Sequence, residues 1–158
     1  MKKKILIIVS IVVVIALGVV LYNSLFNTPY TEIIESIWNI DLPEAGAKEI
    51  YSYSEPSFHG DGIRYHVIDY PIGNETKRIE DTKFQLEKLF PASVTTPTEK
   101  QIEDVVLILE QTQEEIPKDT IPEFEKCQLI YKEKDDGSEL YLFYWYGTGT
   151  VYVIENIF

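Results

Sequence analysis

The chain has 158 residues, of which 14 are basic and 26 are acidic, and its formal net charge is −12 at pH 7. This length suits one domain, and the acidity argues against a surface built for nucleic acid phosphates or anionic lipid headgroups. The sole cysteine, Cys127, cannot form an internal disulfide, so we expect it to be a small core residue in a domain stabilised by apolar packing.

The N-terminal segment predicts a membrane anchor. Three lysines follow the initiating Met, and residues 5–25 then carry no charge. Eighteen helical residues span about 27 Å, close to the ~30 Å thickness of a bilayer's hydrocarbon. The positive-inside rule places residues 1–4 in the cytoplasm and residues 26–158 outside the membrane. The alternative is a secretory signal cleaved near Gly18, which would release the domain.

After the anchor, Thr28-Pro29 predicts a helix start with Thr28 as N-cap, and the helix should end near Asn39. Residues 48–54 alternate and are rich in Tyr, which predicts a strand, with residues 62–70 as its hairpin partner. A second helix is expected from about residue 75 to Phe90, where Pro91 stops it.

The capping box Thr96-Pro97-Thr98-Glu99 predicts the start of a third helix, which runs to about Thr112 with Ile102, Val105, Val106 and Leu109 inward. Residues 126–133, 140–146 and 151–158 read as strands. The Asp136-Gly137 pair predicts a type I′ turn between the first two, and the continuous apolar run LYLFYWY predicts that the second lies inside the sheet.

This order of elements predicts an α+β domain. An N-terminal transmembrane helix should precede a single domain with five antiparallel strands and three helices in the order α-β-β-α-α-β-β-β. Tight hairpins favour the antiparallel sheet, and we expect the helices to cover one of its faces.

Residues 57–70, SFHGDGIRYHVIDY, gather side chains that could bind a metal or transfer a proton. A type II′ turn centred on Gly60-Asp61 would place Glu55 opposite His66, with Arg64 on the same face. We take Glu55, Arg64 and His66 as a candidate polar cluster, which would be either an acid–base group or a plain cross-strand ion pair.

His59 and Asp61 form a second candidate, at the turn itself. Two ligands are few for a zinc site, and His66 with Asp69 would lie on opposite faces of a strand, so we predict no metal. Neither a nucleophile elbow nor a nucleotide-binding glycine loop occurs in the sequence. We therefore predict no catalytic residue and no cofactor.

Tyrosine and tryptophan side chains are frequent in the predicted strands. If one sheet face is left open by the helices, it would display aromatic rings that suit contact with protein, peptide or glycan. The alternative is a sheet whose aromatic side chains pack among themselves. The candidate aromatic surface consists of Tyr51, Tyr53, Tyr144, Trp145, Tyr146 and Tyr152.

The run from Trp38 through Leu42-Pro43 to residues 50–53 and 57–62 resembles small membrane-anchored proteins of low-GC Gram-positive bacteria whose function is unknown. The resemblance covers mainly residues 38–70. It implies a location at the cell envelope and carries no active site.

The sequence thus predicts a non-catalytic, membrane-anchored binding module outside the cytoplasm. Its acidity suits a basic protein or peptide partner, as in an inhibitor or immunity protein that neutralises a basic effector. The alternatives are a small hydrolase that uses His66 with Glu55 or His59 with Asp61, and a structural role in which the membrane helix makes the contacts.

Overall fold

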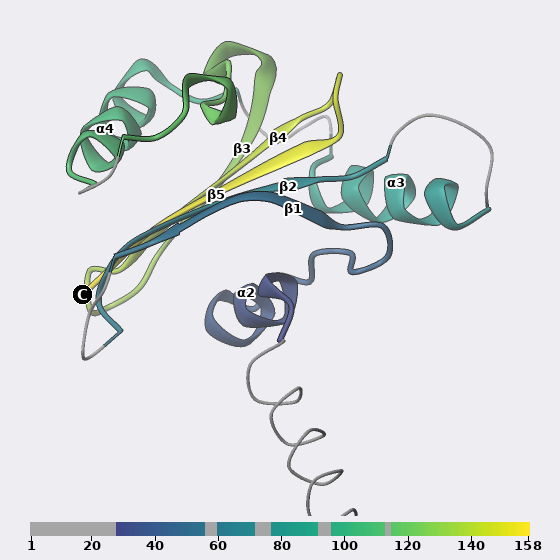
Figure 1. Ribbon diagram of the computed structural model, residues 1–158, viewed down its shortest axis with the longest axis horizontal. Coiled ribbons are helices and arrows are strands. Elements are labelled where there is room, and N and C mark those ends of the chain that lie inside the picture. Colours follow the sequence, from purple (N-terminus) through teal and green to yellow (C-terminus); the bar gives the residue numbers. More distant parts are fainter. Residues whose placement is uncertain (1–27, 56–59, 72–76, 92–95, 113–114) are drawn as a thin grey trace, which may run out of the picture. The chain divides into compact units, whose positions relative to one another are not determined.

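The computed structural model (Figure 1) describes residues 28–55, 60–71, 77–91, 96–112 and 115–158. The predicted anchor, residues 5–25, and the signal cleavage near Gly18 lie outside these ranges. Within them, no helix has both the length and the apolar character needed to cross a membrane.

The chain divides into two compact units, Met1–Asp41 and Leu42–Phe158. The first contains helix α2, Tyr30–Trp38, whose N-cap is Pro29 rather than the predicted Thr28. Asn39 closes the helix in the left-handed conformation, with φ of 52°, and its N–H donates to the Glu35 carbonyl at 2.8 Å. Asn tolerates this conformation, so the predicted end of the helix is confirmed.

The second unit is built on a five-stranded antiparallel sheet, as predicted. The strand order is β1-β2-β5-β4-β3, so the last strand of the chain lies at the centre and joins the two hairpins. The strands are β1 Lys48–Ser54, β2 Gly62–Asp69, β3 Cys127–Glu133, β4 Glu139–Trp145 and β5 Thr150–Ile157. Helices α3, Lys77–Leu89, and α4, Glu99–Glu110, follow β2, and the short turns η1, Lys118–Thr120, and η2, Phe124–Lys126, precede β3.

The helices cover both faces of the sheet, which corrects the expectation of one covered face (Figure 1). On the face we call the α4 face, Val105 and Ile108 pack on Tyr65, Phe143 and other side chains of all five strands. On the opposite face, the α3 face, the ring of Phe90 lies 5.0 Å from that of Tyr144. Leu140 to Tyr144 are therefore buried on both sides, and β4 lies inside the sheet as predicted.

The first hairpin has a different register from the predicted one. Ser54 pairs with Arg64 and Ser52 with His66, whereas a two-residue turn at Gly60-Asp61 would have paired Glu55 with His66. The Glu55 N–H donates to the Ile63 carbonyl at 2.9 Å, and the Ile63 N–H donates to the Glu55 carboxylate at 3.2 Å. Glu55 is held at Ile63, and the connection is longer than a type II′ turn.

A β-bulge at Ile50 changes the phase of β1. Glu49 pairs with Ile68 and Tyr51 with Val67, and Ile50 is the additional residue between them. In an unbroken strand, residues 49 and 51 would share a face. The bulge instead places Glu49 on the α3 face and Tyr51 on the α4 face.

The capping box of the third predicted helix and the hairpin at Asp136-Gly137 both form, but the position of the box and the type of the turn differ from the predictions. The capping box of α4 begins at Thr98: its side chain accepts from the Gln101 N–H, and the Gln101 side chain accepts from the Thr98 N–H. The predicted box at Thr96 lies two residues earlier. The β3–β4 hairpin forms, but among its described residues only Gly137 has positive φ, 86°, so the turn is not type I′, which needs positive φ at two residues.

Candidate functional site

Of the predicted polar cluster, His66 and Arg64 share the α3 face and Glu55 does not. Residues two apart on β2 point the same way, and the register places Ser52 and Ser54 opposite them. Glu55 instead lies beside Ile63 at the end of the hairpin. The strand register therefore does not place Glu55 opposite His66, as the predicted turn would have done.

The carboxylate beside His66 belongs to Glu49, which no sequence pattern had indicated. Nδ1 of His66 lies 2.5 Å from Glu49 Oε1, because the bulge at Ile50 brings Glu49 onto this face. Burial lowers the pKa of His66, although the bond to Glu49 and the charges of Glu49 and Glu155 oppose that shift. A buried imidazole whose proton is weakly held is neutral at neutral pH.

Arg64 faces Glu155 across the β2–β5 ladder. Its guanidinium lies 4.0 Å from the Glu155 carboxylate, whose side chain is fully buried, and it also donates to the Gly60 carbonyl at 2.8 Å. Arg64 thus ties the end of the hairpin connection to the central strand. This is the geometry of a structural ion pair, which is the plainer of the two roles predicted for Arg64.

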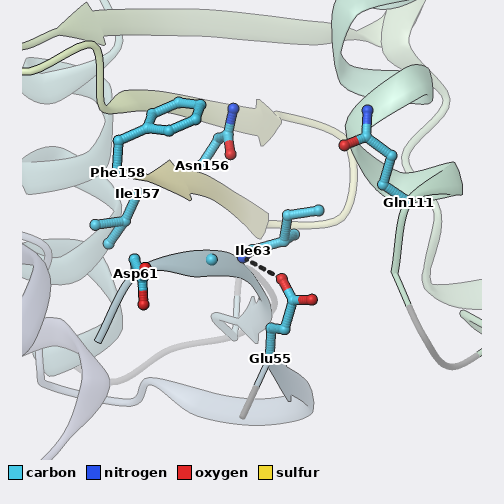
Figure 2. A pocket seen from close by; sticks show the side chains of 8 residues that line it. Glu55, Asp61, Ile63, Gln111, Asn156, Ile157 and Phe158 are labelled. Atoms are coloured by element: carbon cyan, nitrogen blue, oxygen red, sulfur yellow. Dashed lines mark hydrogen bonds between the residues drawn. The ribbon is translucent and has the colours of Figure 1, made fainter. Parts of the chain in front are cut away.

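Glu55 and Asp61 both line a cavity that we call the acidic pocket. Figure 2 shows their side chains with that of Gln111 from the end of α4 and with those of Asn156 and Phe158 from the end of β5. The cavity has a volume of about 410 Å³. Its described lining contains two carboxylates and no basic residue: Glu55, Asp61, Gly62, Ile63, Gln111, Asn156, Ile157 and Phe158.

His59, the partner proposed for Asp61, lies outside the described residues. Within the described ranges, no group of three or more His, Cys, Asp or Glu side chains could hold a metal ion. Cys127 is buried, as predicted, and burial raises the pKa of its thiol to about 12, so it remains a thiol at neutral pH.

The predicted aromatic surface does not form. Tyr51, Tyr53, Trp145 and Tyr152 belong to the α4 face, where they pack in or against the core. Tyr144 lies on the α3 face, where its ring is tilted against that of Phe90. Tyr146 alone of the six is exposed, and its hydroxyl donates to Glu87 at 2.7 Å. Because helices cover both faces, the rings serve the core rather than an open surface.

A second cavity, which we call the α4 groove, lies between the C-terminal half of α4 and the segment that follows it. Its volume is about 390 Å³. Apolar side chains make up most of its lining, with two glutamates: Val106, Leu109, Glu110, Thr112, Glu115, Ile116 and Ile121. Val106 and Ile121 are each 38 % exposed, so apolar surface is open to solvent here.

The α4 groove was missed because Val106 was assigned to the buried side of its helix. The sequence does carry a signal for it. Residues 105–109 of α4 are all apolar, and one helical face cannot bury five consecutive residues. Val105 and Ile108 turn to the core, so Val106 and Leu107 must face outward.

Comparisons with protein-family models, with curated proteins and with solved structures gave no match. The functional argument therefore depends on the chain's own residues and on the geometry described above.

Proposed function

We propose that this chain is a single-pass membrane protein whose residues 26–158 form an extracytoplasmic, non-catalytic module that binds a protein partner at the cell envelope. The lysine-led apolar segment at residues 5–25 supports the anchor and its orientation. The net charge of −12 supports a basic partner, because it favours encounter with positively charged proteins.

The observation that carries a binding role is the α4 groove. It exposes apolar surface next to carboxylates at the edge of the core, and such partly apolar concave surfaces are typical of protein contact sites. His66, the histidine of the alternative hydrolase hypothesis, is buried and bonded to Glu49. Its side chain lines neither the acidic pocket nor the α4 groove.

The test of location uses the full chain with a C-terminal epitope in intact cells stripped of their wall. Protease added from outside should remove the epitope while a cytoplasmic marker protein survives. An epitope that resists the protease until the membrane is broken would contradict the proposed topology.

The test of binding uses a photo-crosslinking residue at position 106, in the α4 groove, and a matched one at Phe84, which is 67 % exposed on α3. Light should join position 106, and not position 84, to a basic envelope protein, and the yield should fall as salt rises. Equal yields at both positions, or a yield that salt does not change, would contradict the proposal.

A further inference from the structure

The α4 groove differs from the rest of the core in that its apolar lining reaches the surface. Of its lining residues, Ile116 is buried, whereas Val106 and Ile121 are exposed. Leu107, next along the helix, is 55 % exposed. A groove with this lining can accept an aliphatic or aromatic side chain from another molecule.

The ionisable side chains that line the α4 groove are all acidic. Its ionisable lining residues are Glu110 and Glu115, and none of its described lining residues is basic. The last turn of α4 has no basic residue, so the negative end of the helix dipole is not compensated by a side chain of that turn. The acidic pocket borders the same helix end through Gln111 and adds Glu55 and Asp61.

From this combination we infer that the α4 groove is the docking site for a segment of a partner protein in which an apolar side chain is flanked by lysine or arginine. The inference rests on the proposed function and names the partner's chemistry. The apolar side chain would fill the space between Val106 and Ile121, and the flanking cations would lie near Glu110 and Glu115. A second copy of this chain is disfavoured because its own net charge is −12.

The test measures peptide binding to the full chain in nanodiscs of zwitterionic lipid, with empty nanodiscs subtracted. The probe is a fluorescent peptide of leucine and lysine at helical spacing. Two matched peptides carry glutamate for lysine or serine for leucine. The leucine–lysine peptide should bind, and each matched peptide should bind at least about tenfold more weakly, since each lacks one half of the recognised pattern.

Variants locate the site. V106D/I121D and E110K/E115K should each weaken binding of the leucine–lysine peptide about tenfold or more. E44K/E125K is the matched control, because it changes the net charge equally at two exposed glutamates outside the lining of the groove. It should retain nearly full affinity, and circular dichroism should show that all three variants are folded.

Three results would overturn the inference: no binding of the leucine–lysine peptide, equal binding of its glutamate counterpart, or equal weakening by E44K/E125K and E110K/E115K. The last would mean that only overall charge is recognised. These failures are separate from those of the proposed function. A crosslink from position 106 with no preference for the basic peptide would leave the binding role and refute the partner's chemistry. Peptide binding at the groove, together with an epitope that proves to lie inside the cell, would leave the partner's chemistry standing and refute the proposed topology.

Discussion

At the scale of single residues, the ion pair between Arg64 and Glu155 is notable because the Glu155 carboxylate is fully buried. Glu155 has no exposed side-chain surface, and Arg64 lies 4.0 Å from it. A carboxylate that loses its cation keeps the cost of its desolvation, so we expect Arg64→Leu to lower the free energy of unfolding by about 3 kcal/mol. Adding Glu155→Leu should restore part of that loss, because the buried carboxylate is then removed as well.

Urea unfolding of the full chain in detergent micelles, followed by tryptophan fluorescence, measures both variants. A double variant less stable than Arg64→Leu alone would show that Glu155 does not depend on this guanidinium.

His66 should make the stability of the domain depend on pH. Burial lowers its pKa in the folded state, so below the unfolded value of about 6.5 the unfolded chain binds the proton more readily than the folded one. Stability is therefore complete above that value and is lost as the pH falls through it. We expect the wild-type chain to lose more stability than His66→Gln between about pH 7.5 and pH 5.5.

Unfolding curves at the two pH values give the comparison, and the variant accounts for the carboxylates that titrate in both proteins. Equal losses would mean that His66 is protonated as easily in the folded protein as in the unfolded chain.

The neighbours of His66 show which contacts could be predicted from the sequence and which could not. That His66 and Arg64 share a face followed from the two-residue period of a strand and is confirmed. Their carboxylate partners did not follow, because Glu49 reaches this face only through a bulge at Ile50, and Glu155 arrives from a strand that begins near the far end of the chain. Neither event leaves a local pattern.

At the scale of elements, two threonines compete in the sequence as the N-cap of α4. Thr96 and Thr98 both precede an acidic or amide residue by three positions, but only Thr98 forms the capping box in the structure. Thr98→Ala should therefore cost about 1 kcal/mol of stability, and Thr96→Ala should cost close to nothing. Urea unfolding measures the two, and a larger cost at Thr96 would move the helix start to the predicted position.

The elements themselves were largely predictable, and their connections were not. The alternation of residues 48–54 gave β1 with the bounds that the structure has. The predicted register of its hairpin was wrong because Glu55 pairs with Ile63: its N–H donates to the Ile63 carbonyl and its carboxylate accepts from the Ile63 N–H. The helices were expected on one face, and nothing in the sequence of α3 tells that it packs on the face opposite α4.

For the whole molecule, the central position of β5 determines whether the sheet can exist. β5 pairs with β2 on one side and with β4 on the other, so it connects two hairpins that share no other strand pairing. A chain that ends at Gly149 should lose its cooperative unfolding transition, since isolated hairpins are at best marginally stable. Removal of Phe158 alone, which lies beyond β5 and is 70 % exposed, is the control.

Limited proteolysis of both truncated chains provides the measurement. Rapid cleavage throughout the domain is expected for the chain that ends at Gly149, and a protease-resistant core in that chain would contradict the role given to β5.

The place of β5 also sets the order of events during biogenesis. A ribosome completes β1 and β2 well before β5, the strand that joins the two hairpins, so the sheet closes only after β5 has been synthesised. In the proposed topology the chain threads a translocation channel with its N-terminus held back, and a polypeptide that cannot finish its fold stays extended enough to pass. If the domain is exported as proposed, the late synthesis of β5 delays its folding until it has crossed the membrane.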